Sequence, residues 1–139
     1  MLLGLLTACA HQKKATGGID PVVQNAVPLG LIGNVNEASD SVTIEQATLT
    51  GDLLLLDISY AGGCQKHEFS LIGSAAISKS LPPRRAITLI HQNVGDKCKK
   101  RVHEKLYFNV EAFAYTKEKG STIFLDLDGY RNSIEYIKQ

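Results

Sequence analysis

Two cysteine–histidine pairs hold the residues best suited to chemistry in this chain. They are Cys64-x2-His67, within GGCQKHEF, and His91-x6-Cys98. Two thiols and two imidazoles are a ligand set for tetrahedral zinc. A thiol with a neighbouring imidazole can also act as an activated nucleophile. Finally, two cysteines in an oxidising compartment form a disulfide. The pairs therefore raise three hypotheses: a metal site, a catalytic thiol and a structural bond.

Spacing and chemistry favour the structural bond. Six residues between His91 and Cys98 are a loose spacing for a structural zinc site, whose ligands usually come from tight turns. A second thiol beside a nucleophilic cysteine would trap it as a disulfide. We therefore predict a Cys64–Cys98 disulfide, with the metal set Cys64, His67, His91 and Cys98 as the alternative. Strand parity places both histidines toward the core, where their ring nitrogens would bond backbone carbonyls or each other.

The first residues indicate the compartment. The sequence MLLGLLTAC is apolar and ends in small residues before Cys9, as a cleavable signal does. Leu6-Thr7-Ala8-Cys9 resembles the lipobox of bacterial lipoproteins, although no lysine or arginine precedes it. That resemblance implies removal of residues 1–8 and acylation of Cys9. Ala10, where aspartate is absent, implies sorting to the periplasmic face of the outer membrane. Export would leave Cys64 and Cys98 as the pair to oxidise.

Bulk composition excludes several classes of partner and architecture. The 139 residues are 44% hydrophobic and 21% charged, which suits one globular domain. A net charge of +1 gives no reason to expect nucleic acid as a partner. No apolar run reaches the ~20 residues of a transmembrane helix. We expect a monomer, held at the membrane by its lipid anchor, without a cofactor.

The rest of the chain consists of strands separated by turn residues. Period-2 alternation is clearest in RVHEKLYFNV, and Gly51-Asp52 and Asp128-Gly129 are turn signals. We expect a lipidated tether over 9–40 and a domain over 41–139, with part of 22–32 adding an edge strand. The predicted fold is an all-β antiparallel sandwich, immunoglobulin-like or Greek-key, or a small barrel. Its seven predicted strands are 41–49, 53–60, 67–73, 84–92, 101–110, 121–129 and 133–138.

An ordered set of motifs carries a family resemblance. The motifs are Gly62-Gly63-Cys64, His67-x-Phe69-x-Leu71, Pro82-Pro83, Leu89-x-His91, Gly95-Asp96-x-Cys98 and Leu106-x-Phe108-Asn109-Val110. With them, residues 41–139 resemble the C-terminal β-sandwich domain of the NigD-like envelope lipoproteins, with Asn109 and Lys99 where that family more often has acidic residues. The resemblance implies the fold, the disulfide and the anchor, and no catalytic activity.

We therefore predict a non-catalytic, membrane-anchored envelope protein that is an interaction or structural module, with an envelope protein as its candidate partner. Two alternatives are a periplasmic inhibitor or immunity-type lipoprotein and a Cys/His metal-binding module. An exposed loop with its own inhibitory side chains would favour the inhibitor, and 80–85 is the loop that stands out. The candidate binding residues are His67, His91, Arg84 and Arg85. A basic run at 97–101 is a weaker candidate for binding phosphate or lipopolysaccharide, since such runs are usually solvated turns.

Overall fold

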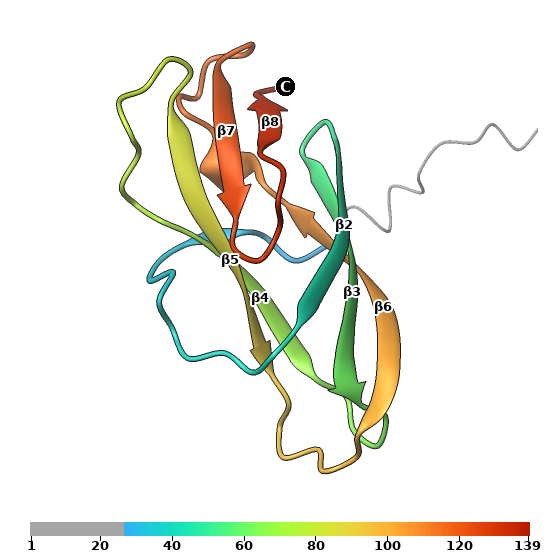
Figure 1. Ribbon diagram of the computed structural model, residues 1–139. Coiled ribbons are helices and arrows are strands. Elements are labelled where there is room, and N and C mark those ends of the chain that lie inside the picture. The colour runs from blue at the N-terminus through green and yellow to red at the C-terminus, as the bar shows by residue number, and fades with distance from the viewer. Residues whose placement is uncertain (1–26) are drawn as a thin grey trace, which may run out of the picture.

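The computed structural model describes residues 27–139, which form two facing β-sheets (Figure 1). The predicted signal segment, Cys9 and the first part of the tether lie outside these residues. Within 27–139 the one helical element is a short 3-10 turn, η1. The elements are β1 (Leu31–Ile32), β2 (Thr43–Thr50), β3 (Leu53–Gly62), β4 (Glu68–Gly73), β5 (Arg84–Gln92), β6 (Lys100–Asn109), η1 (Glu111–Phe113), β7 (Thr122–Leu127) and β8 (Ile134–Ile137).

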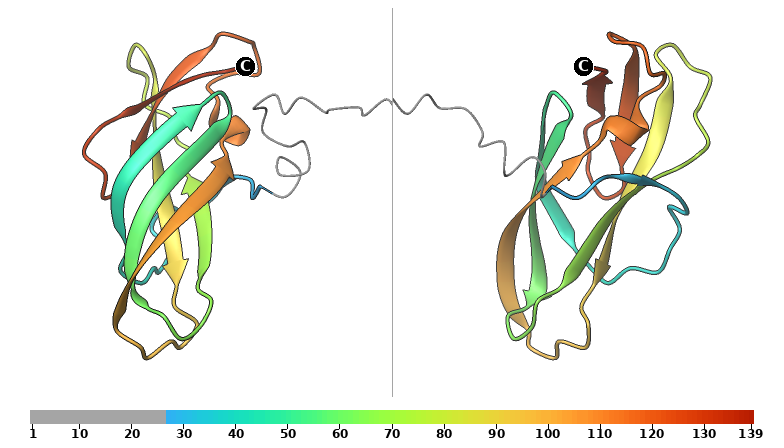
Figure 2. Two further views of the ribbon diagram at one scale, coloured as in Figure 1. Left: turned by 90° about the vertical axis from the view of Figure 1, so that its right-hand side faces the viewer. Right: turned by 180° about the vertical axis from the view of Figure 1, so that it is seen from behind.

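The two sheets pack face to face as a sandwich (Figure 2). One has five strands in the order β1-β4-β5-β7-β8, and the other has three in the order β2-β3-β6. Each of the seven predicted strands corresponds to one of β2–β8, and β1 is the additional edge strand expected within 22–32. The all-β, two-sheet prediction is confirmed.

The sandwich is mainly antiparallel, but two of its six strand pairs are parallel. β5 and β7 pair in parallel, with Arg85 beside Leu125, and β1 runs parallel to β4. The reason lies in the connection between β5 and β7. After β5 the chain leaves the five-stranded sheet and runs back as β6 in the other sheet, so it enters β7 in the same direction as β5. The remaining four strand pairs are antiparallel.

The core lies between the inner faces of the two sheets. In β3 the even-numbered residues Leu54, Leu56 and Ile58 are buried, whereas Leu53, Leu55 and Asp57 are only partly buried. This alternation is the period-2 pattern of a strand with one inward face. Opposite them, the five-stranded sheet contributes buried residues of β5, β7 and β8, and Phe113 of η1 fills one end of the same cluster. Burial of these side chains is the main stabilising contribution to the fold.

The domain begins earlier than the predicted boundary at Ser41. Pro28 and Gly30 hydrogen-bond to the backbone of Asn109 at the end of β6, and β1 pairs with the end of β4. Further on, the N–H of Asp40 donates to the carbonyl of His91 at 2.7 Å. Residues 27–40, expected to be tether, therefore lie along the sandwich. Among residues 27–139 no helix is long and apolar enough to cross a membrane.

Candidate functional site

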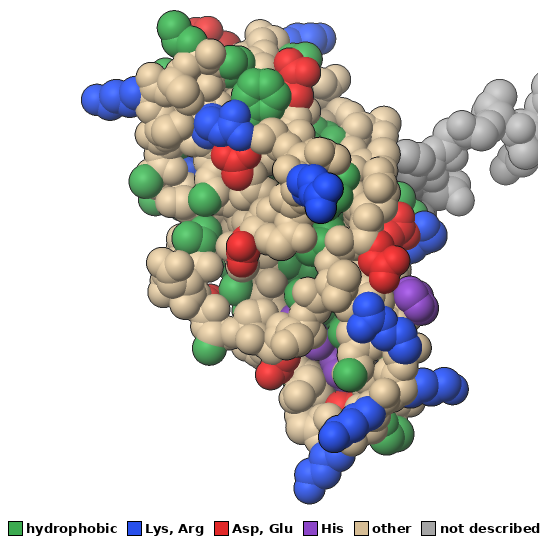
Figure 3. All heavy atoms as spheres, viewed as in Figure 1, with side chains coloured by type: hydrophobic (Ala, Val, Ile, Leu, Met, Phe, Trp, Pro, Cys, Tyr) green, Lys and Arg blue, Asp and Glu red, His purple; other side chains and the backbone are tan. Residues whose placement is uncertain are grey.

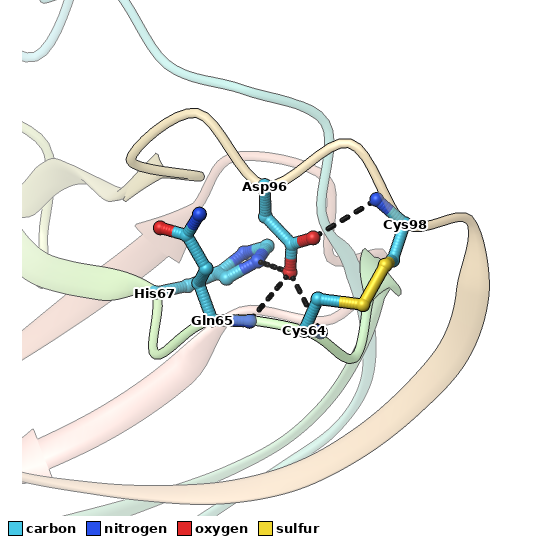
Figure 4. Close-up of a disulfide and its surroundings, with 5 residues drawn as sticks. All are labelled: Cys64, Gln65, His67, Asp96 and Cys98. Atoms are coloured by element: carbon cyan, nitrogen blue, oxygen red, sulfur yellow. Dashed lines mark hydrogen bonds and ion pairs between the residues drawn. A yellow bond between two sulfur atoms is a disulfide. The ribbon is translucent and has the colours of Figure 1, made fainter.

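Cys64 and Cys98 form the predicted disulfide (Figure 4). Cys64 lies two residues after the end of β3 and Cys98 two residues before the start of β6, and their Cα atoms are 5.8 Å apart. β3 and β6 are neighbours, with Gly62 opposite Lys100 at this end of the ladder. The bond therefore closes the open end of an antiparallel pair whose strands are joined through a long excursion into the other sheet.

Asp96 lies at the centre of the cluster and was not among the predicted site residues. Its carboxylate accepts hydrogen bonds from the backbone N–H groups of Cys98 at 2.9 Å, Gln65 at 3.1 Å and Cys64 at 3.2 Å. The Nε2–H of His67 donates to the same carboxylate at 2.9 Å. Both side chains of this ion pair are fully buried. One carboxylate thus holds together the two loops that the disulfide joins.

These donors determine the protonation state of Asp96. The hydrogen bond from His67, then that from the N–H of Cys98, hold the pKa of the Asp96 carboxyl well below its usual value. Burial opposes this shift, because a low-dielectric environment disfavours a charge, and the N–H groups of Cys64 and Gln65 reinforce it. Asp96 is therefore ionised at neutral pH.

The two histidines continue the chain of hydrogen bonds away from Asp96. His67 Nδ1 faces His91 Nε2 at 2.7 Å, and His91 Nδ1 lies 2.9 Å from the carbonyl oxygen of Ser41. The histidines were predicted to bond backbone carbonyls or each other, and both kinds of contact are present. The site thus runs as Asp96–His67–His91–Ser41 from the disulfide loops into the sandwich.

The partners of this chain fix its number of protons. A carboxylate and a carbonyl only accept, so His67 Nε2 and His91 Nδ1 both carry hydrogen. A third proton must lie between His67 Nδ1 and His91 Nε2, because two facing lone pairs at 2.7 Å would repel. Two neutral imidazoles hold two N–H protons, so the pair carries one positive charge. That charge balances the negative charge of Asp96, as buried ions require.

Aromatic rings surround the charged pair. Phe69 stacks on His91 with ring centroids 4.7 Å apart, and Tyr60 lies 4.6 Å from His67 and 5.0 Å from His91. The faces of such rings attract a cation. The Tyr60 hydroxyl donates to Glu104 at 2.7 Å, and burial together with this carboxylate raises the pKa of Tyr60 to about 12. The rings therefore exclude water from the imidazoles while stabilising their charge.

The glycines of the GGC motif leave room for this arrangement. A Cβ on Gly62 would lie 2.7 Å from His67 Nε2 and 3.0 Å from the Asp96 carboxylate, which is too close for either atom. Gly63 has φ +106°, a conformation that side chains rarely adopt. The motif thus serves the histidine–aspartate contact as well as the turn.

The cluster does not form the alternative four-ligand metal set. Both sulfurs are bonded to each other, and all four ring nitrogens of His67 and His91 have partners within the protein. The same bond removes the thiol that a Cys–His nucleophile requires. These side chains stabilise the fold, and the disulfide leaves no free thiol among them to bind zinc or to act as a nucleophile.

The two arginines suggested as binding residues are held by internal contacts. Arg84 donates to Asp126, with 2.9 Å from Nε to Oδ2, and to Ser133, and its guanidinium lies over the Phe124 ring. Arg85 is 5% exposed and donates to backbone carbonyls, including that of Phe113 at 3.2 Å. Both belong to β5 rather than to the loop before it. Arg85 thus satisfies buried carbonyls and does not present a charge to solvent.

Comparisons with known proteins place the fold. No family model matches the sequence, and no match was found among curated proteins. A NigD-like immunity protein from Bacteroides caccae shares the fold with a TM-score of 0.61 and 14% identity, over 81% of this chain and 65% of that one. A DUF1344 protein of unknown function from Bacteroides vulgatus has a TM-score of 0.50 and 16% identity, over 81% of this chain and 58% of that one. The chain therefore spans less than two thirds of either protein.

At these identities the likeness shows a shared fold, and function does not follow from it. The resemblance to NigD-like proteins, predicted from the ordered motifs, is supported at that level. The two proteins are an immunity protein and a protein of unknown function, and neither is described as an enzyme.

Proposed function

We propose that this chain is a non-catalytic, membrane-anchored protein of the bacterial cell envelope whose sandwich acts as an interaction module. One observation carries the proposal. The cysteines, histidines and aspartate best suited to chemistry are bonded to one another in a buried cluster at one end of the fold. Their role is to hold the β3–β4 and β5–β6 loops together. The surface of the two sheets is then the part of the domain that can bind a partner.

Two features support an envelope location. A Cys64–Cys98 disulfide is stable in an oxidising compartment, which the periplasm provides. Leu6-Thr7-Ala8-Cys9 supplies the pattern for lipid attachment, and Ala10 supports sorting to the outer membrane. We infer that an acylated Cys9 holds the domain at the periplasmic face of that membrane.

Removal of the Cys9 thiol should release the protein from the membrane. The full chain expressed in a Gram-negative host should partition into detergent, and Cys9→Ser should move it to the soluble fraction, because a serine cannot be acylated by the lipoprotein pathway. Thr7→Ser, which keeps the Leu-x-Ala-Cys pattern, is the matched control and should stay with the membrane. Equal partitioning of Cys9→Ser and the parent chain would contradict the anchor.

A periplasmic inhibitor or immunity-type protein is the second candidate. The connection before β5 carries Leu81, whose side chain is 98% exposed. Ser78 and Ser80 hydrogen-bond to each other at 3.0 Å, and the N–H of Ser78 bonds the carbonyl of Arg84, so the loop is braced on the strand. A braced loop that presents one apolar side chain suits insertion into a pocket of a target protein. The shared fold with a NigD-like immunity protein is compatible with this role.

A further inference from the structure

The outer edge of β6 is open along most of its length. β6 is the last strand of the three-stranded sheet, and among residues 27–139 it gains one further contact, at Asn109. There Asn109 N–H donates to Pro28 O at 2.9 Å, and Gly30 N–H donates to Asn109 O at 2.7 Å. In Figure 2, left, β6 forms the margin of its sheet, with this short segment at its end.

The Asn109 contacts reveal which backbone groups of β6 are free. Both polar groups of Asn109 point away from β3, and in an antiparallel ladder this direction alternates along the strand. The residues that share its orientation are Tyr107, Lys105, His103 and Arg101. Their N–H and C=O groups therefore face outward, and no strand within the described part of the chain pairs with them, so they form a template for another strand.

An apolar groove runs beside this edge. It has a volume of about 650 Å³ and lies between β6 and β4, with Phe69, Leu106 and Phe108 among its lining residues. β1 pairs with Ile72 and Gly73 only, so the first part of β4 has no strand on this side. A strand added to β6 would place every second side chain over the groove.

Charge indicates the kind of strand that fits. The outward side chains of β6 at the open edge include Arg101, His103 and Lys105. Lys105 also pairs with Asp57, and Glu45 lies 3.9 Å from Arg101 and from His103. Figure 3 shows Lys and Arg side chains gathered at the end formed by the β3–β4 and β5–β6 connections. A second copy of this chain would bring two such cationic edges together, which like charges disfavour. The exposed basic residues at that end are Lys66, Lys97, Lys99, Lys100 and Arg101.

We infer that the β6 edge binds an extended segment of a partner protein by strand addition, and that this segment alternates apolar and acidic residues. The backbone of the segment completes the ladder, its apolar side chains enter the groove, and its acidic side chains face the cationic edge. This inference rests on the proposed function and names the surface and the partner's chemistry.

Amide hydrogen exchange on the full chain tests the edge and its ligand together. In the free protein the amides of Arg101, His103, Lys105 and Tyr107 should exchange quickly, between slowly exchanging neighbours bonded to β3. A ten-residue peptide that alternates valine and aspartate should then slow these four amides, by roughly tenfold or more at saturation. The matched control is a valine–lysine peptide of equal length, which should not.

Two variants confirm where the peptide binds. Tyr107→Pro removes an outward N–H and should abolish the protection, whereas Ala47→Pro, on the opposite edge of the sheet, should leave it unchanged. Arg101→Gln keeps the edge and should weaken binding by roughly fivefold, a rim-charge effect that salt also reduces. Thermal unfolding of each variant shows whether it is folded.

Three outcomes would overturn the inference: no protection by the acidic peptide, equal protection by the basic one, or full binding to folded Tyr107→Pro. None of them touches the proposed function, which would survive if a partner binds elsewhere on the sandwich. Conversely, absence of any envelope partner removes the proposed function itself.

Discussion

Cys64→Ala, Cys98→Ala and the double variant should each lose roughly 4 kcal/mol of unfolding free energy, because each removes the same bond. The bond spans a sequence separation of 34 residues, and cross-linking such a loop restricts the unfolded chain strongly. A domain of this size has only ~5–15 kcal/mol in total. The loss is therefore a large fraction of its stability.

Urea unfolding of the Cys9→Ser chain, in which Cys64 and Cys98 are the only cysteines, measures this loss directly. The oxidised parent treated with a reductant is the internal control and should match the double variant. Equal stabilities of parent and double variant, within ~1 kcal/mol, would show that the bond contributes little to the folded state.

Asp96→Asn should lower the melting temperature by roughly 10 °C or more, because it leaves a buried charge without its partner. The substitution removes the negative charge that balances the His67–His91 pair and replaces one acceptor oxygen with a donor NH2 group. Depending on which oxygen is replaced, either the backbone N–H of Cys98 or those of Cys64 and Gln65 then lose their acceptor. Asp40→Asn is the matched control, since Asp40 accepts a single backbone hydrogen bond at an exposed site. Its effect should be a few degrees at most.

The contribution of Asp96 should also depend on pH. Its folded-state pKa is lower than its unfolded value, so the stabilisation is fully present above about pH 4 and falls as the pH drops through the folded pKa. The difference in melting temperature between the parent and Asp96→Asn should therefore narrow progressively as the pH falls below about 4. A difference that is the same at pH 7 and pH 2 would contradict an ionised Asp96.

The sequence predicted the strands because their signals are local. Alternation and turn dipeptides identified seven of the eight strands, and the apolar character of 22–32 pointed to the eighth. Strand order and the parallel β5–β7 pair depend on which sheet each connection crosses to, and no local pattern encodes that. LLLLDISY begins with four consecutive leucines, so alternation cannot predict which of them face the core. The pairing of this strand with β6 determines the inward face.

Strand alternation predicted the site residues that lie on or beside strands. It could not predict contacts between side chains from separate loops. Alternation with Phe69 and Leu89 placed His67 and His91 toward the core, where they meet. Asp96 was missed because an aspartate after Gly95 is typical of any turn. Arg85 follows two prolines and was predicted to be a binding residue of that loop. In the structure its guanidinium donates to backbone carbonyls inside the fold. The one available sign for Asp96 was its place two residues before Cys98, within the ordered motif set.

Photo-crosslinking in living cells tests the interaction module most directly. The full chain, expressed in its native host, would carry a photoreactive residue at Tyr107 on the β6 edge, at Leu81 on the braced loop, or at Lys117 on a remote exposed loop as control. We expect a discrete protein adduct from Tyr107 and none from Lys117; an adduct from Leu81 alone would favour the inhibitor. If folded, membrane-located protein yields no protein adduct from photoreactive residues placed across both sheets of the sandwich, Tyr107 and Leu81 included, the interaction module is contradicted.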